Sequence, residues 1–268
     1  EDVDVHGGFA VAEPGAISEV KRREIVMRRN MEPVATLPAP RPHPCPACAT
    51  VSTDDNLRAE IAATAARLIA EEGCEYGQAK RRAVQELLGD ARSAPVPDNA
   101  EVEREVRRHL RLFEADSHPK LLAGLREVAS ALMERLAIYD PHLTGAVLNG
   151  TATEHSDIHL HLYVDSAKDV EVFLLDAGVE FDVDEGPPDE RPRMFERLSF
   201  LMPAPRDIGL PRQLDRVAVH LHVYPRDAIR VAPRHRLDPG VEPDLHPVEA
   251  SGRAGLTAVR RLIQDTTQ

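Results

Sequence analysis

The feature that most constrains the fold of this chain is a change in the period of its apolar residues. Up to about residue 136 they recur every three or four positions, which is typical of amphipathic helices. From about residue 157 they alternate with polar residues, which is typical of strands with one buried face. The pattern therefore predicts an α+β fold, in which an N-terminal helical region precedes a mixed β-sheet with helices on one face.

Four helices are expected ahead of this change, each marked by an apolar stripe. Their expected extents are 53–73, 78–88, 102–113 and, with Ser117 as the cap, 121–136. The expected strands are 143–148, 157–164, 179–183, 198–202 and 216–224. Ser166 is expected to cap a helix after the second strand, and Ser251 is expected to cap the last helix of the chain.

Composition divides the chain into four segments. Residues 1–52 are rich in proline, which removes backbone donors, and are expected to form a disordered extension. Residues 53–139 make up the helical region, 140–232 the strand-rich domain, and 233–268 an irregular tail with a C-terminal helix. His43, Cys45 and Cys48 look like half of a zinc site, but a closed site needs four ligands and no second Cys-x-x-Cys follows.

The charge balance limits the partners that the chain is expected to bind. It has 33 Lys and Arg against 45 Asp and Glu, a formal net charge of −12. Such a chain is repelled by nucleic-acid phosphates unless its basic residues cluster, so nucleic acid is not an expected partner. The sequence has no run of about 18 apolar residues, so no membrane span is expected. The residues near the N-terminus also lack the apolar core of a signal peptide. The cytoplasm is therefore the expected location.

One stretch, residues 145–161, carries a pattern with chemical meaning, G-A-V-L-N-G-T-A-T-E-H-S-D-I-H-L-H. A glycine-containing turn lets backbone N–H groups approach a phosphate group without interference from a Cβ atom. Two residues spaced i and i+2 on the strand that follows point to the same face. This stretch resembles the signature of nucleotidyltransferases of the DNA polymerase beta type, most closely that of the uridylyltransferases of nitrogen regulation and of small nucleotidyltransferase domains.

The resemblance implies an activity and a set of site residues. The activity is transfer of a nucleoside monophosphate from an NTP to a hydroxyl group of a protein or small molecule. The resemblance places the phosphate-binding turn at Gly145, Ala146, Gly150 and Ser156, and the first metal-binding aspartate at Asp157. In the family, a second aspartate two residues later and a third carboxylate from a later strand complete a site for two Mg²⁺ ions, which neutralise the phosphates and activate the attacking hydroxyl.

The chain departs from this pattern in three places. Ala146 stands where a glycine or serine is usual, and His159 stands where the second aspartate is expected. The later strand that should supply the third carboxylate offers His220 and His222 and no acid. These departures replace hard oxygen ligands with imidazoles, which suit Zn²⁺, Mn²⁺ or Fe²⁺ better than Mg²⁺.

Strand parity makes the histidines converge. Asp157, His159 and His161 share one face of their strand, and His220 and His222 share one face of theirs. If the two strands are neighbours, a single face carries one aspartate and up to four histidines. The predicted catalytic residues are Asp157 and His159, and the predicted metal ligands add His220 and His222. A divalent metal, Mg²⁺ or Mn²⁺ with Zn²⁺ as the alternative, is the expected cofactor, and an NTP is the expected substrate.

Other interpretations stay open. Asp182 and Asp184 become acidic ligands if the strand order differs. A fold that has lost catalysis would act as a nucleotide-binding or protein-interaction module, with the helical region as the docking surface. A helical DNA-binding module is a third hypothesis, because residues 65–73 resemble the first helix of repressor domains; its basic face would be Arg67, Lys80, Arg81 and Arg82. The P-loop and Gly-x-Ser-x-Gly motifs are absent from the sequence.

Overall fold

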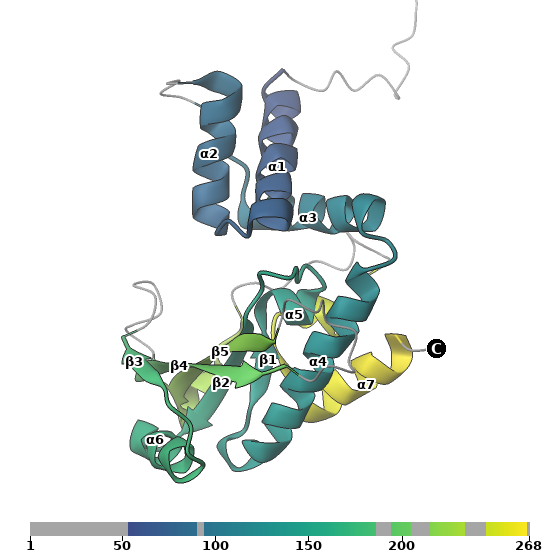
Figure 1. Ribbon diagram of the computed structural model, residues 1–268. Coiled ribbons are helices and arrows are strands. Elements are labelled where there is room, and N and C mark those ends of the chain that lie inside the picture. Colours follow the sequence, from purple (N-terminus) through teal and green to yellow (C-terminus); the bar gives the residue numbers. More distant parts are fainter. Residues whose placement is uncertain (1–52, 90–93, 186–193, 205–214, 234–244, 267–268) are drawn as a thin grey trace, which may run out of the picture. The chain divides into compact units, whose positions relative to one another are not determined.

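Figure 1 presents the computed structural model, which describes residues 53–89, 94–185, 194–204, 215–233 and 245–266. Within these residues the chain forms seven α-helices and a six-stranded mixed sheet. The expected combination of helices with a mixed sheet is confirmed. The proline-rich extension, with His43, Cys45 and Cys48, lies outside the described residues. Thr50–Gln268 make up one compact unit.

Three of the four helices in the predicted helical region, residues 53–139, share an apolar core, while the fourth packs on the sheet. The three are α1 (Thr53–Glu72), α2 (Tyr76–Leu88) and α3 (Asn99–Phe113). Their stripes meet at Ile61, Leu68 and Leu110, each at most 1% exposed. A capping box fixes the start of α3, because the Asp98 side chain accepts from the Glu101 N–H and the Glu101 side chain accepts from the Asp98 N–H. The three helices predicted from the apolar periodicity are confirmed.

The sheet is centred on two parallel strands, β2 (Ile158–Val164) and β5 (Arg216–Pro225), which lie side by side in Figure 1. The strand order is β3-β4-β5-β2-β1-β6, and the other neighbouring pairs are antiparallel. The outer strands are β1 (His142–Thr144), β3 (Asp182–Asp184), β4 (Glu196–Pro203) and β6 (Ala254–Gly255). The strand predicted over 179–183 is observed as β3, which begins later, at Asp182.

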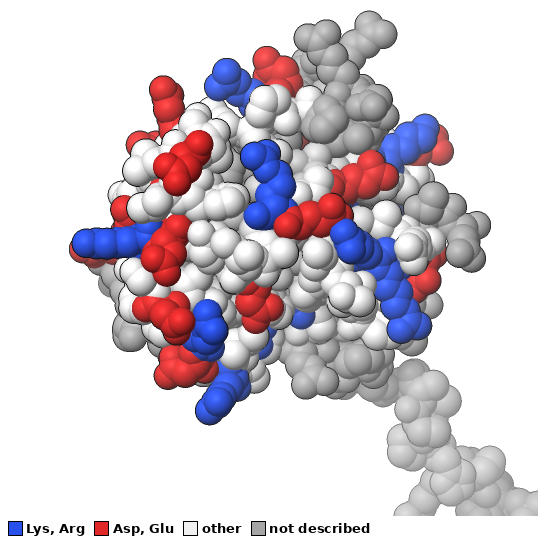
Figure 2. All heavy atoms as spheres, turned by 90° about the horizontal axis from the view of Figure 1, so that it is seen from below, with Lys and Arg blue, Asp and Glu red and all other residues white. Residues whose placement is uncertain are grey.

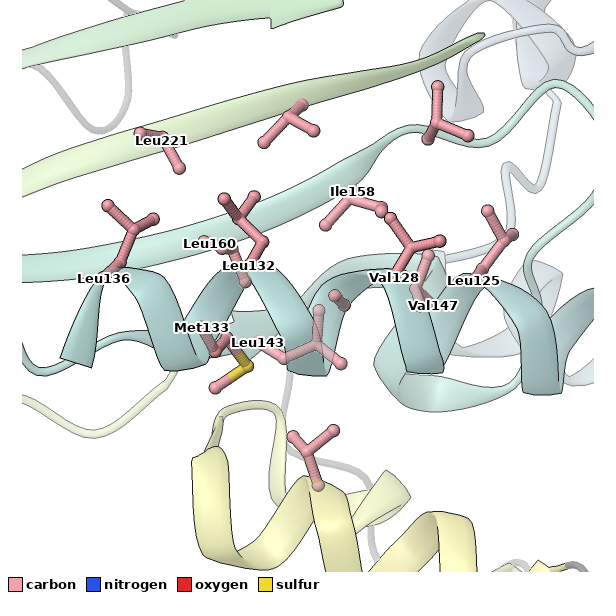
Figure 3. Packing of buried hydrophobic residues seen from close by; sticks show 14 of the residues in the cluster. Leu125, Val128, Leu132, Met133, Leu136, Leu143, Val147, Ile158, Leu160 and Leu221 are labelled. Carbon is pink, nitrogen blue, oxygen red and sulfur yellow. The ribbon is translucent and has the colours of Figure 1, made fainter. Parts of the chain in front are cut away.

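One face of this sheet is apolar and contributes to the main core. The core also takes buried side chains from α4 (His118–Arg135), α6 (Ala167–Asp176) and α7 (Leu256–Thr266). Ile158, Leu160 and Leu221 on the two central strands have no exposed surface. Figure 3 shows Leu132 and Leu125 of α4 pointing from the helix toward these strands. The apolar half of the strand alternation is thus covered by helices.

The predicted strand over 143–148 is wrong in its second half. β1 ends at Thr144, and the next residues form the short helix α5 (Gly145–Asn149). Gly145 has a φ of 71°, which takes the chain out of the sheet and which glycine adopts without Cβ strain. Val147 and Leu148 are buried as members of this helical turn. An apolar run this short does not distinguish a strand from a helical turn by its period.

The predicted capping of helices by Ser117, Ser166 and Ser251 is wrong, because these side chains do not make the expected capping hydrogen bonds. Ser117 precedes α4, but its side chain makes no capping hydrogen bond and its hydroxyl donates to the Glu114 carbonyl. Ser166 precedes α6 and likewise makes no side-chain cap. Ser251 closes a 3-10 turn, and α7 begins later in the chain. In two of these cases the serine hydroxyl bonds a nearby carbonyl, which competes with capping.

A buried arginine fixes the position of α5. Arg126 of α4 is 1% exposed and donates to the carbonyls of Val147 and Leu148, each at 3.0 Å. The same guanidinium lies 2.6 Å from the carboxylate of Glu249. Burial lowers the pKa of Arg126 while Glu249 raises it, and arginine stays charged in proteins. A Cβ on Gly150 would lie 3.2 Å from the Glu249 Oε1 atom, so the end of α5 sits tightly against this ion pair.

The surface shown in Figure 2 carries interleaved basic and acidic side chains, without a large area of one sign on that face. Arg260 of α7 illustrates the arrangement, since it pairs with Glu134 of α4 while both side chains stay half exposed. None of the helices in the described part of the chain is long and apolar enough to cross a lipid bilayer.

Truncating a central core side chain is expected to destabilise the fold strongly. Leu160→Ala removes a fully buried side chain and should lower the free energy of unfolding by about 2–5 kcal/mol. Leu201→Ala on β4 is the matched control, because that side chain is 58% exposed; its cost should stay below about 1 kcal/mol. Urea denaturation followed by circular dichroism measures both values. Equal losses would contradict the assignment of the two sheet faces.

Breaking the buried ion pair is also expected to be costly. Arg126→Met leaves the largely buried Glu249 carboxylate without its guanidinium partner and should lower the free energy of unfolding by about 3–5 kcal/mol. Adding Glu249→Gln removes the stranded charge and should restore part of the loss. Arg260→Met breaks a half-exposed pair and should cost less than about 1 kcal/mol. The same denaturation measurement compares the three variants, and a loss at Arg126 no larger than at Arg260 would rule out this role.

Candidate metal centre and adjoining pocket

The two central strands carry the same sequence pattern in the same register. His159, His161 and Tyr163 of β2 lie directly beside His220, His222 and Tyr224 of β5, as the list of Cα partners of this parallel pair shows. Leucines or valines fill the alternate positions on the core face. The hypothesis that the histidines of the two strands are neighbours on one face is confirmed.

Three side chains on this face form a group that can hold a metal ion. One ligand atom each from Asp157, His159 and His220 lies within 4.8 Å of the other two. The His220 Nε2 atom is 3.1 Å from the Asp157 Oδ2 atom, and the rings of His159 and His220 stack with centroids 4.9 Å apart. All three residues are partly exposed, so an ion can reach them from solvent.

Neighbouring side chains orient both imidazoles. The Ser199 hydroxyl of β4 lies 2.8 Å from the His220 Nδ1 atom, and the His222 Nε2 atom lies 3.2 Å from the His159 Nδ1 atom. Metal-binding histidines commonly use their second ring nitrogen in this way, which fixes the ring and its tautomer. His222 therefore touches a ligand of the triad, and it does not complete the group with Asp157 and His220.

The environment keeps His159 uncharged. Burial lowers the pKa of its imidazole to about 3, and His222 and His220 act in the same direction while Asp157 opposes them. The main cause is the loss of water around the charged ring. A neutral imidazole retains a lone pair, which is the form that binds metal ions.

The residues of the predicted phosphate-binding turn fall into two groups. Gly145 and Ala146 line a pocket next to His159, and a Cβ on Gly145 would lie 3.5 Å from the His159 ring. Gly150 instead ends α5 against Glu249. The Ser156 hydroxyl accepts from the backbone N–H of Thr153 within its own loop, at 2.9 Å. The structure thus brings Gly145 and Ala146 to the histidine face and gives Gly150 and Ser156 contacts within their own turns.

The acidic alternatives lie on another strand. Asp182 and Asp184 belong to β3, which β4 separates from β5. Asp184 forms an ion pair with Arg197 of β4, with 2.9 Å between the Arg197 Nη2 and Asp184 Oδ2 atoms. The position beside His159 on the neighbouring strand is that of His220.

A pocket of about 480 Å³ begins at His159, the member of the metal group that lines it, and extends along the face. Its walls include β2, β4 and β5, the turn at α5, and the segments before β6 and after β5. The helical region adds Tyr76 and Glu103 to the lining. Glu103 also accepts from the Asn149 side chain at 2.6 Å and pairs with Arg107, which ties α3 to the end of α5. Burial raises the pKa of Tyr76 to about 12, so its phenol stays neutral.

Sequence reasoning missed several lining or orienting residues, among them Tyr163, Tyr224, Arg197 and Ser199. The two tyrosines had a visible signal, since His-Leu-His-x-Tyr occurs twice in the chain. The positions of Arg197 and Ser199 follow only from the pairing of β4 with β5, which no sequence motif predicts. Comparison with protein-family models, with curated proteins and with solved structures finds no match to this chain.

The His159 ring is expected to stay neutral when the pH falls from 7 to 5, because its pKa lies at about 3 while a free imidazole takes up its proton near 6.5. Nuclear magnetic resonance of the ring nitrogens in metal-free protein measures this. Since only the unfolded chain binds the proton between these values, the free energy of unfolding should fall as the pH drops from about 6.5 toward 3. The fall should be shallower in His159→Gln. A His159 that titrates above pH 6 would overturn the assignment.

Proposed function

We propose that this protein is a metal-dependent nucleotidyltransferase that moves a nucleoside monophosphate from an NTP to a hydroxyl group of a protein or small molecule. The observation that carries the proposal is the position of His220. It lies on a later strand, beside His159 and within ligand distance of Asp157. The resemblance to nucleotidyltransferases implies a metal ligand on a later strand, at the position that His220 occupies. The His220 Nδ1 atom has a hydrogen-bonding partner in Ser199, and the His159 Nδ1 atom has one in His222. The other nitrogen of each ring can therefore face an ion.

The donor set fits a divalent metal ion. Asp157, His159 and His220 would hold it, with Ser199 and His222 fixing the two imidazoles. Two imidazoles and one carboxylate favour Mn²⁺ or Zn²⁺ over Mg²⁺, because nitrogen ligands suit borderline metals. When bound, the ion neutralises phosphate charge and acidifies an attacking hydroxyl.

The chain's own residues then have defined tasks. The resemblance implies phosphate binding by Gly145, Ala146, Gly150 and Ser156. Gly145 and Ala146 leave room for phosphate oxygens beside His159, whereas Gly150 and Ser156 make contacts that keep the turn in shape. In the transfer, the acceptor oxygen forms a bond to the α-phosphorus while the bond from that phosphorus to the bridging oxygen breaks. Pyrophosphate leaves, and the proton of the acceptor hydroxyl passes to water.

A second candidate function is a nucleotide-binding or protein-interaction module that does not catalyse transfer. It is favoured by the presence of a single carboxylate in the metal group, where the family uses three. In that case the metal and an NTP would still bind, and the helical region would be the docking surface for a partner protein.

Label transfer from α-phosphate-labelled NTPs tests the proposal. Wild-type protein is incubated with each NTP and with Mn²⁺, Zn²⁺ or Mg²⁺, alone and with cell extract. Transfer is expected to be faster with Mn²⁺ or Zn²⁺ than with Mg²⁺, and Asp157→Ala and His220→Ala should reduce it at least about 100-fold because each removes a ligand. Ser199→Ala should weaken metal binding about 10–100-fold, measured by calorimetry, because it frees the His220 ring.

His109→Gln is the matched control, since this histidine lies on α3 outside the metal group. It should leave both metal binding and transfer unchanged. Binding of an NTP and a metal without transfer under any condition would favour the second candidate. Failure to bind any of the three metals, or equal binding by Asp157→Ala, would reject the metal centre itself.

A further inference from the structure

The pocket continues beyond the metal group as a row of rings. The His161 ring lies 4.8 Å from that of Tyr224, and the rings of Tyr224 and Tyr163 stack 5.8 Å apart. Both tyrosines are at most 8% exposed. Flat rings packed along one wall offer contact surface to another flat ring, with little loss of side-chain freedom because they are already fixed.

The positively charged side chain of Arg253 lines the end of the pocket next to Tyr163. Arg253 donates from Nη1 to the Tyr163 hydroxyl at 2.6 Å and from Nη2 to the Ile229 carbonyl at 2.7 Å. Both acceptors are neutral, and no carboxylate pairs with Arg253 within the described residues. The other arginine of the lining, Arg197, is neutralised by Asp184. A part-buried guanidinium with neutral partners favours an anionic ligand, because it keeps further donors for a carboxylate or phosphate.

The acidic residues of the lining do not cancel this charge. Glu103 is paired with Arg107 at 3.0 Å, and Glu75 is exposed at the start of α2. The pocket thus has His159 of the metal group at one end, rings along its length and, at the other end, a guanidinium without a carboxylate partner among the described residues.

We infer that this pocket binds the acceptor, a planar aromatic small molecule that carries one anionic group and one hydroxyl group. The anionic group contacts Arg253, the ring packs against His161 and Tyr224, and the hydroxyl points toward His159, the member of the metal group that lines the pocket. The role of the hydroxyl rests on the proposed nucleotidyl transfer, whereas the ring and the anion are inferred from the pocket alone.

The dimensions agree with such a ligand. His159 and Tyr163 are four residues apart on β2, which is roughly 13 Å between Cα atoms at about 3.3 Å per residue. The Arg253 side chain and the metal group each occupy part of that span. One ring with a short side chain fills the remainder, and a cavity of about 480 Å³ is within the range of small-molecule sites.

Binding is measured by calorimetry on the whole chain, with metal removed by a chelator and without NTP. The probe is 3-(4-hydroxyphenyl)propionate, compared with the neutral 4-propylphenol and the non-aromatic 3-(4-hydroxycyclohexyl)propionate. Wild type is expected to bind the probe at least about tenfold more tightly than either analogue, since each lacks one of the two recognised features. Arg253→Met should weaken binding of the probe at least about tenfold, and Arg253→Lys should recover part of it.

Arg260→Met is the matched control and should bind like wild type, because Arg260 lies on α7 and does not line the pocket. Thermal melting and circular dichroism confirm that Arg253→Met is folded. Equal affinity for the neutral phenol, no binding of the probe, or binding of inorganic phosphate as tight as that of the probe would each overturn the inference. Probe binding without label transfer under any condition would keep the ligand class and reject the transfer, so the two failures are distinguishable.

Discussion

The parallel pairing of β2 with β5 in a single register is the constraint on which the rest of the structure depends. It turns Leu160 and Leu221 together into the core that α4 covers. It turns His159 and His220 together onto the opposite face, where Asp157 joins them. The apolar core and the candidate site thus lie on the two faces of one pair of strands. A shift by one residue would exchange the two sides, burying the imidazoles and exposing the leucines.

Much of this arrangement was predictable because it follows from the spacing of apolar and polar residues over short stretches of the chain. Alternation placed Asp157 and His159 on one face, and the stripes predicted the helices. The α5 turn was not predictable in this way, since a positive φ at Gly145, and not the apolar run, ends β1. Arg253 escaped prediction because its contact with Tyr163 joins distant parts of the chain. Such contacts depend on tertiary packing, which local patterns do not encode.

Two buried charged pairs clamp the segment that leads into the site. Arg126 holds the carbonyl end of α5 from α4, and Glu103 holds Asn149 from α3. Charges removed from water are stable only when their partners are in place, so both clamps are sensitive to single substitutions. The position of Gly145 beside His159 therefore depends on residues outside the metal group, of which Glu103 lines the pocket and Arg126 does not. Substitution of these residues would move the turn that carries Gly145.

The near-identity of β2 and β5 has a consequence for how the chain reaches its native state. If β5 slid by two residues, Leu162 would face Leu221 and Leu160 would face Val219, so the buried side would look almost unchanged. Hydrophobic burial alone therefore does not select the native alignment. The selection falls to the polar side, because this slide would move His220 away from Asp157 and Tyr224 away from Tyr163. The polar side chains of this face then also help to select the alignment of the two strands, and their replacement risks a compact chain in which the strands are misaligned.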